Sequence, residues 1–213
     1  MTNKYIYFIA NWKMFGDLKA LKSVNKVKNF LKKFKFEKFS KIVYCPPNTL
    51  IYSLSKQIKS RYIRVGAQNC HHSELPGAFT GSINPKMLIN VGAKFVIIGH
   101  SENRQNGESD RLINHKIKAA LKSKLKVIFC IGETLKEKQR KRKKKNLMKQ
   151  ISIGLNKIKN KKNILIAYEP VWAIGSGLIP NKEDLIETID FIKKKVKDSK
   201  VLYGGSVNPK NIL

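Results

Sequence analysis

Charged and polar residues that could carry acid–base chemistry stand directly after short apolar runs in this sequence. His100 and Glu102 follow the run at 94–99, and Glu169 follows the run at 163–168. A carboxylate can remove a proton from carbon while an imidazole donates to the oxygen that gains charge, provided that the two lie close together. Other runs are followed in the same way by Asn11, Lys13, Gln68, Asn69, Glu133 and the Gly204-Gly205-Ser206 segment. A single such residue is usually a helix cap or part of an ion pair, but convergence from six strands points to a site.

Seven short runs rich in β-branched and aromatic residues predict the strands that must position these side chains. They occupy 5–10, 41–45, 62–67, 94–99, 126–131, 163–168 and 200–203. Their starts are roughly 20 to 40 residues apart, which suits a strand, a crossover helix and two short loops. The run at 95–98 is apolar throughout, which indicates parallel strands that are buried on both faces.

The segments between these runs carry helix signals. Asp17 and Asn181 each precede apolar residues at helical spacing, and Asn84-Pro85 begins a helix that stops near Gly92. The predicted buried stripes are Leu18, Leu21, Val24, Val27 and Leu31 in the first helix, and Leu185, Ile186, Ile189, Ile192 and Val196 in the last. Alternating strands and helices predict an α/β fold, either a closed barrel or an open doubly wound sheet. In both architectures functional residues gather at the carboxyl ends of the strands.

Length and composition narrow the class of protein. A chain of 213 residues predicts a single domain over 1–213, and the absence of eighteen consecutive apolar residues predicts a soluble protein. The apolar run at 5–10 is too short for a secretion signal and no small-residue cleavage site follows it. Cys45, Cys70 and Cys130 lie far apart without metal-ligand spacing. We therefore expect reduced thiols, a cytoplasmic location and no metal site.

The formal net charge of +30 is the one unusual bulk property, and it raises the hypothesis of a nucleic-acid or membrane-surface partner. Only six of the 44 basic residues are arginine, the residue that suits bidentate recognition of phosphates and bases. The lysines fall mostly on predicted helix faces, with a dense run at 136–145. We expect a solvated surface, no membrane partner and at most non-specific nucleic-acid binding. A positive field also speeds the capture of an anionic substrate.

Seven motifs together carry a resemblance to one family. They are ANWKM at 10–14, GAQN at 66–69, GAFTG at 77–81, IGHSENR at 98–104, CIGET at 130–134, AYEPVWAIGSG at 167–177 and YGGSV at 203–207. In kind and in order the chain resembles triosephosphate isomerase from about residue 5 to its end. The resemblance implies a parallel (β/α) TIM barrel. It also implies the interconversion of dihydroxyacetone phosphate and D-glyceraldehyde 3-phosphate, in glycolysis and gluconeogenesis, without a cofactor.

The resemblance also implies catalytic roles that fit an enediolate reaction. Glu169 would be the base, since a carboxylate closed off from water gains basicity. His100 would polarise the carbonyl as a neutral imidazole, a point for which this very enzyme is the standard illustration. Lys13 and Asn11 would stabilise the enediolate and hold the phosphate, and Glu102 would keep Lys13 and its loop in place, with a direct part in proton shuttling left open.

A lid and two backbone donors follow from the same resemblance. The predicted lid comprises Pro170, Val171, Trp172, Ala173, Ile174, Gly175, Ser176 and Gly177. A proline on one flank and small residues on the other are typical of a segment that moves between hinges. Closure would exclude water from the enediolate phosphate and bring the Gly175 N–H to the ligand. Ser206, after two glycines, would donate a further N–H to the phosphate.

The segment 68–82 is long for a strand-to-helix loop, and long loops in compact domains are usually functional. In the family this loop reaches into a neighbouring subunit. The resemblance therefore predicts a homodimer, with Phe79 and Thr80 in the dimer loop and Thr80 touching the partner's site.

The sequence departs from the family in two places. Ser82 and Asn103 stand where relatives usually have an acid and an arginine, and losing both partners together avoids stranding one charge. The family's eighth strand and helix are absent from the sequence, so we expect a C-terminally incomplete barrel, a fragment with impaired activity. Two other hypotheses stay open: a basic binding protein that retains the scaffold, and an inactive truncated relative.

Overall fold

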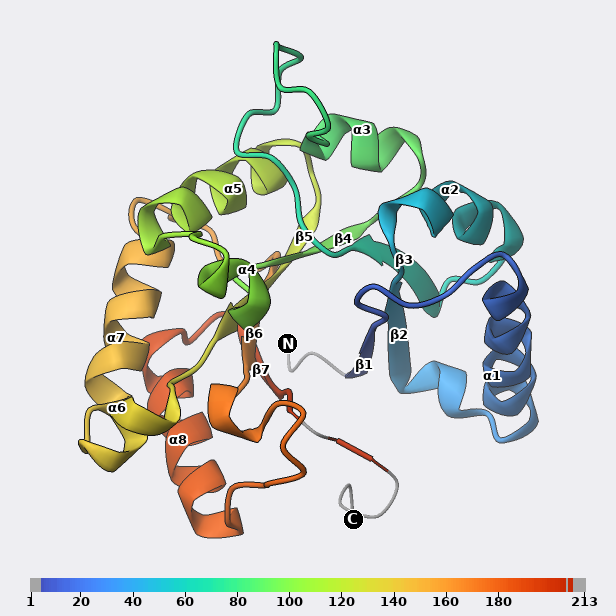
Figure 1. The fold of residues 1–213 in the computed structure, drawn as a ribbon. Helices are drawn as coiled ribbons and strands as arrows, with labels where there is room; N and C mark the ends of the chain where they lie inside the picture. The colour runs from blue at the N-terminus through green and yellow to red at the C-terminus, as the bar shows by residue number, and fades with distance from the viewer. Residues whose placement is uncertain (1–4, 206, 209–213) are drawn as a thin grey trace. The chain divides into compact units, whose positions relative to one another are not determined.

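The computed structural model describes residues 5–205 and 207–208 of the chain (Figure 1). The described residues form two compact units, one made of 5–97 and 119–126 and the other of 98–118 and the described part of 127–208. The expectation of a single domain over 1–213 stays a prediction. No helix among the described residues is long and apolar enough to cross a membrane.

The first unit is built on parallel strands that follow one another in chain order. They are β1 (Ile6–Asn11), β2 (Ser40–Cys45), β3 (Ile63–Ala67) and β4 (Phe95–Ile98), the last residue of which belongs to the second unit. Ile6 pairs with Ser40, Ile42 with Ile63, and Gly66 with Phe95. The helical elements are η1 (Lys19–Leu21), α1 (Lys22–Lys33), η2 (Phe36–Lys38), α2 (Asn48–Gln57) and α3 (Pro85–Asn90). Figure 1 shows α1 and α2 on the same side of β2 and β3.

The second unit repeats this plan with three parallel strands. They are β5 (Lys126–Ile131), the first residue of which belongs to the first unit, β6 (Ile164–Tyr168) and β7 (Lys200–Tyr203). Val127 pairs with Ile164, and Leu165 with Lys200. The helical elements are α4 (Ser101–Gln105), α5 (Asp110–Lys122), α6 (Leu135–Gln139), α7 (Lys143–Gly154), η3 (Val171–Ala173) and α8 (Lys182–Lys195), and residues 119–122 of α5 belong to the first unit. Ion pairs between Lys143 and Asp184 and between Lys144 and Glu187 join α7 to α8, which lie next to each other in Figure 1.

The seven predicted strands are confirmed, and so are the helix starts predicted at Asn84 and Asn181. The start predicted at Asp17 is displaced: Asp17 Oδ1 accepts from the Ala20 N–H at 2.9 Å, but η1 begins at Lys19 and the regular helix α1 only at Lys22. The Asn84 side chain accepts from the Met87 N–H at 2.9 Å, and the Asn181 side chain accepts from the Asp184 N–H at 2.8 Å. Each bond satisfies a donor that the first turn of a helix leaves without a partner. Local side-chain chemistry therefore sets where these helices begin.

Burial confirms the predicted core strands and corrects two helix positions. All residues of β4 and β6 are buried, as expected of parallel strands covered on both faces. The prediction that Ile186 is buried is wrong, since it is 50% exposed and the fully buried Thr188 takes the inward position instead. Leu18, expected in the first stripe, is 66% exposed because it precedes η1 and lies outside the regular helix.

Candidate active site

His100 lies at the end of β4, where it is the N-cap residue of α4 and only 5% exposed. Its Nδ1 accepts a hydrogen bond from the Glu102 backbone N–H at 3.3 Å. A nitrogen that accepts carries no proton, so a neutral imidazole in this arrangement has its proton on Nε2. The strand-to-helix turn thus selects Nε2 as the donor of the ring.

Glu169 follows β6 and brings its carboxylate to the other side of that ring. Its Oε2 is 3.7 Å from His100 Nε2, and its side chain is 18% exposed. The Glu169 backbone N–H donates to the Ile131 carbonyl at 2.8 Å, which continues the pairing of β5 with β6 past the strand end. The sequence prediction that these two residues lie together is therefore met in the geometry, while their catalytic roles remain a proposal.

Two glycines are required by the close packing around Glu169. A Cβ on Gly132 would lie 1.8 Å from the Glu169 carbonyl oxygen, and a Cβ on Gly204 would lie 2.7 Å from its Cγ. Real Cβ atoms do not approach other atoms so closely, and at Gly132 the obstacle is backbone that cannot rotate away. Glycine at 132 therefore permits the position of the Glu169 main chain, and glycine at 204 that of its side chain.

Glu102 lies beside His100 on the first turn of α4. Its Oε2 is 3.5 Å from His100 Nδ1, and its side chain is 51% exposed. The Nδ1 edge of the ring thus faces both an N–H and a carboxylate of the same residue. The predicted role of Glu102 in holding Lys13 stays a prediction, because the two residues belong to different units.

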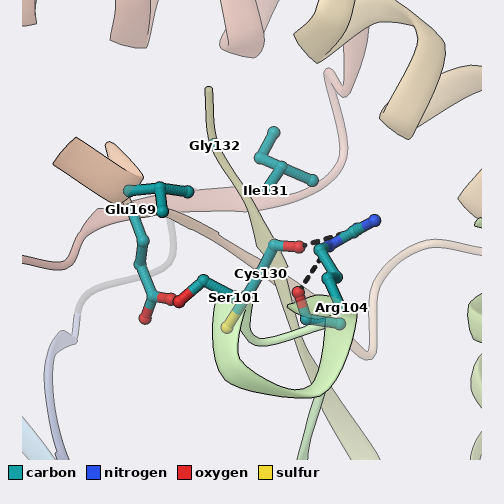
Figure 2. A pocket seen from close by; sticks show the side chains of 8 residues that line it. Ser101, Arg104, Cys130, Ile131, Gly132 and Glu169 are labelled. Carbon is teal, nitrogen blue, oxygen red and sulfur yellow. Dashed lines mark hydrogen bonds between the residues drawn. The ribbon is translucent and has the colours of Figure 1, made fainter. Parts of the chain in front are cut away.

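A small pocket adjoins these residues within the second unit. It is lined by Gly99, Ser101, Arg104, Cys130, Ile131, Gly132, Glu169 and Val171. Figure 2 shows the Glu169 carboxylate pointing toward the Ser101 side chain and the Arg104 guanidinium on the opposite side of the pocket. The pocket therefore has a carboxylate on one wall and a cation on the other.

Arg104 fixes the ends of two strands, a function that the sequence did not reveal. It donates to the Gly99 carbonyl at 2.7 Å and to the Cys130 carbonyl at 3.2 Å (Figure 2). It also pairs with Asp110 at 2.6 Å. Carbonyls at strand ends have lost their sheet partners, and a guanidinium with several fixed donors can satisfy two of them. Only its place within the motif at 98–104 marked Arg104 in advance.

Glu133 is a second carboxylate at the strand ends, and it is fully buried. Its Oε1 accepts from the Trp172 indole at 2.9 Å and from the Tyr168 hydroxyl at 3.2 Å. Burial raises the pKa of Glu133, although the hydrogen bond from Trp172 opposes this shift. Its position after an apolar run was noted from the sequence, but its function of holding the lid was not.

Gln150 of α7 supports the segment that carries Glu133. The Gly132 N–H donates to Gln150 Oε1 at 2.9 Å, and Gln150 Nε2 donates back to the Gly132 carbonyl at 2.9 Å. The amide thus replaces a strand partner for a residue just beyond β5. Glutamine on a helix gives no signal of this kind in a single sequence, because its partner is 18 residues away.

One half of the predicted lid is fixed by burial and side-chain contacts, and the other half is exposed. Ala173 is fully buried, and Trp172 donates to Glu133 while Lys138 Nζ lies 3.6 Å from the centroid of the indole ring. Gly175 and Gly177 are exposed with φ values of 70° and 74°, a region that glycine enters without steric cost. The remaining lid residues are Pro170, Val171, Ile174 and Ser176, the last of which donates to the Trp172 carbonyl at 2.9 Å.

Asn11 and Lys13 lie together in the first unit, at the end of β1. Lys13 has a φ of 51°, which costs a non-glycine residue about 1–2 kcal/mol. Two side chains hold this conformation: Asn11 Oδ1 accepts from the Lys13 N–H at 2.9 Å, and Gln68 Nε2 donates to the Lys13 carbonyl at 2.7 Å. Their convergence with His100 and Glu169 stays a prediction.

The predicted dimer loop extends between β3 and α3 (Figure 1). Phe79 is 47% exposed, and its ring centroid lies 4.3 Å from that of His71. Thr80 is exposed as well, next to Gly81 with a φ of 80°. The closed end of the loop is fixed by the His71 N–H, which donates to the Ile83 carbonyl at 2.8 Å.

Three further predictions from the sequence concern residues at the margins of the site. Ser206, the expected phosphate donor, lies outside the described residues. The Ser82 N–H donates to the Phe79 carbonyl at 3.0 Å, and the Asn103 carbonyl accepts from the Glu108 N–H at 3.1 Å. With serine at 82 and asparagine at 103, the backbone bonds of both turns are in place.

No group of three or more His, Cys, Asp or Glu side chains in the described part of the chain could hold a metal ion. The prediction that no metal and no cofactor are needed stays a prediction. Parallel βα units that end in a buried imidazole beside a carboxylate define the class: an α/β enzyme that moves protons by acid–base catalysis.

Comparison with known proteins identifies the family within this class. The triosephosphate isomerase family model matches residues 6–213. The triosephosphate isomerase of Aquifex aeolicus is 40% identical over 212 residues, 95% of this chain and 85% of that protein. The Dictyoglomus thermophilum enzyme of the same name is 40% identical over 215 residues, with the same coverage. The chain belongs to the triosephosphate isomerase family.

A solved structure supports the fold assignment. The crystal structure of triosephosphate isomerase from Bartonella henselae matches with a TM-score of 0.85 and 33% identity, over 96% of this chain and 84% of that one. The fold is accordingly the parallel (β/α) TIM barrel, and the described residues supply seven of its strands. Of the two architectures that the sequence left open, the barrel is correct.

Proposed function

We propose that the chain interconverts dihydroxyacetone phosphate and D-glyceraldehyde 3-phosphate. The observation that carries the proposal is the pair of reacting groups: Glu169 Oε2 lies 3.7 Å from His100 Nε2, the nitrogen that bears the proton. A carboxylate and an N–H donor so placed can act on neighbouring atoms of one small substrate. The family assignment supports the same reaction.

The reaction needs only proton transfers. Glu169 takes a proton from the carbon next to the carbonyl, and the electron pair of that C–H bond forms the enediolate double bond. His100 Nε2–H stabilises the oxygen that gains charge. A proton also passes from the hydroxyl oxygen to the former carbonyl oxygen, a transfer that His100 Nε2 can relay. Glu169 then returns its proton to the neighbouring carbon, so that aldehyde and ketone exchange places and no electrons leave the substrate.

The remaining assigned residues bind the anion and protect the intermediate. Lys13 and Asn11 are proposed to hold the phosphate and to offset the enediolate charge, and Gly175 and Ser206 to donate backbone N–H groups to the phosphate. The exposed glycines of the lid support a closing motion that excludes water. Glu102, which lies beside His100, is proposed to keep Lys13 and its loop in place.

The variant Glu169→Gln tests the proposal directly. It removes the base and keeps the size of the side chain, so we expect the isomerisation rate to fall by at least about 1,000-fold. Glu183→Gln on the first turn of α8 is the matched control, because Glu183 is exposed and should leave the rate unchanged. An unaltered rate in Glu169→Gln would exclude the proposed base.

Binding of phosphoglycolate, an analogue of the enediolate, separates loss of chemistry from loss of the site. Calorimetry should detect binding to the wild-type chain and to Glu183→Gln. A chain that binds the analogue but does not isomerise the substrate has an intact phosphate-binding site and lacks the catalytic geometry. A chain that binds nothing is an inactive relative.

The proposal extends to a cytoplasmic homodimer that serves glycolysis and gluconeogenesis. Several large apolar side chains of the first unit support a self-association surface, since Met14 is 94%, Phe15 74% and Leu75 59% exposed in addition to Phe79. Cys45, Cys70 and Cys130 are buried and form no disulfide, which agrees with a reducing compartment. Sedimentation equilibrium and cell fractionation measure the two properties.

A further inference from the structure

The stretch 26–39, which runs from α1 through η2, is both basic and aromatic. Its fourteen residues include six lysines, four phenylalanines and a single acid, and no arginine. The overall charge of +30 was expected to be a solvated surface. A uniform lysine coat does not require phenylalanines among the lysines, so this stretch needs a separate account.

Three of these phenylalanines form an exposed cluster, called here the aromatic cluster: Phe30, Phe34 and Phe36. They are 52%, 50% and 50% exposed. The ring centroids of Phe30 and Phe34 are 4.7 Å apart, and each lies 6.1 Å from that of Phe36. Contiguous exposed apolar surface of this kind is uncommon on soluble monomers and marks interaction sites.

The core does not depend on the aromatic cluster. The buried stripe of α1, next to these rings, is anchored by Val24 and Leu31, which are 1% and 7% exposed. The helix therefore has a buried stripe in addition to its exposed rings. Substitution of the exposed rings should leave that stripe and the fold in place.

Lysines surround the aromatic cluster. Lys32, Lys33, Lys35 and Lys38 are all exposed, and Lys33 Nζ lies 5.5 Å from the centroid of the Phe34 ring. Lysine has a long apolar stem and a charged head, so it can lie along an apolar surface while its ammonium group reaches a polar layer. Rings and ammonium groups at one place match the two layers of a membrane surface, the acyl boundary and the anionic head groups.

We propose that the aromatic cluster and its lysines form a peripheral docking surface for bilayers with anionic head groups. The phenylalanines enter the head-group boundary, and the lysines pair with the anionic lipids. A nucleic acid fits less well, because base-stacking platforms present open ring faces, whereas these rings pack against one another. The proposal revises the expectation of no membrane partner, which weighed the overall lysine charge and not the phenylalanines of this stretch, and it does not depend on the catalytic proposal.

Flotation with vesicles tests this docking surface. Wild-type protein should float with vesicles of 30% phosphatidylglycerol in phosphatidylcholine and stay behind with pure phosphatidylcholine. The triple variant Phe30→Ser, Phe34→Ser, Phe36→Ser keeps the net charge and should lower the partition coefficient by at least about tenfold. The triple variant Lys32→Gln, Lys33→Gln, Lys38→Gln should lower it by about 100-fold.

Two controls match these variants in charge and in type. Lys149→Gln, Lys159→Gln, Lys194→Gln removes the same charge from exposed lysines elsewhere, and Tyr52→Ser removes an aromatic ring that is 55% exposed on α2. Both should bind vesicles within about twofold of wild type. Circular dichroism checks that every variant is folded.

Four results would overturn the proposal. In the first, the wild type does not float with anionic vesicles. In the second, the lysine variant of the cluster and the lysine control lose flotation equally. In the third, the phenylalanine variant is folded and floats as the wild type does. The fourth is evidence that something other than a membrane binds the cluster: tighter binding to single-stranded RNA than to vesicles, or a change of oligomeric state in the lipid-free phenylalanine variant. Flotation that falls only in the cluster variants supports the docking surface.

Discussion

The buried wall of the site and the tip of the lid are built in opposite ways, although Ala173 of the wall lies only two residues before the tip. The buried wall, defined here as Gly132, Glu133, Tyr168 and Ala173, has at most 1% exposure at the last three residues. The lid tip, residues 175–178, is exposed throughout. Both regions lie within the second unit and meet at Trp172.

This difference separates positioning from motion. Every member of the buried wall is fixed by close packing or by hydrogen bonds. The wall holds Glu169 in place because Gly132 packs directly against the Glu169 backbone. The lid tip has glycines at positive φ with open space where a Cβ would lie. Rigid support for the base and a loose tip above it are what an enediolate reaction needs, because the base must not move while the cover must.

The largest effect is expected for Gly132→Ala compared with Gly175→Ala. The new methyl group at 132 would lie 1.8 Å from a carbonyl oxygen, and we expect the free energy of unfolding to fall by about 3 kcal/mol or more. At 175 nothing lies within 4 Å, so only the strain of a positive φ remains, about 1 kcal/mol. Urea denaturation of both variants measures the difference.

The comparison would break down if the two alanine variants lost equal stability. That result would mean that the wall relaxes around a methyl group as easily as the lid tip does. Gly132 would then have no special part in holding Glu169.

A smaller effect is expected where the two regions meet. Trp172→Phe removes the indole N–H that donates to Glu133, while the Tyr168 hydroxyl still donates to the same oxygen. We expect a loss of about 1 kcal/mol in the free energy of unfolding. Ser176→Ala at the exposed tip is the control, and a loss there as large as in Trp172→Phe would contradict the distinction.

The smallest effect concerns pH. Burial raises the pKa of Glu133, so the folded state binds this proton more tightly than the unfolded chain does. The free energy of unfolding should therefore fall as pH rises above 4.5, the ordinary value, toward the raised value. Glu133→Gln has no proton to lose, so its stability should fall less over that range. Parallel urea-denaturation profiles of wild type and variant from about pH 4 to 7 would show that Glu133 does not cause the dependence.

Much of the fold was predictable from local patterns. The seven apolar runs became strands, and Asn84 and Asn181 capped the helices that they preceded. Periodicity alone could not place Ile186, because Thr188 two positions further on fills the inward space. The periodicity of apolar residues cannot predict which polar residue becomes buried against a neighbouring element.

The site was predictable only where residue type and position coincide. His100 and Glu169 follow strands directly, so their proximity could be inferred. Arg104 and Gln150 act through hydrogen bonds to backbone groups of distant residues. Because every residue carries the same backbone groups, the sequence does not indicate which of them these side chains bind. The support of the site is therefore visible only in the folded chain.

Hydrogen exchange at the substrate carbon tests the central claim, that Glu169 moves a proton through an enediolate. Glyceraldehyde 3-phosphate is converted in D₂O and the product is examined by NMR. The account predicts deuterium on the carbon that receives the proton, because the proton on Glu169 exchanges with solvent, and it predicts no measurable conversion by Glu169→Gln. Product free of deuterium, formed at full rate by wild type and by Glu169→Gln alike, would indicate direct hydride transfer between the two carbons and would contradict the account.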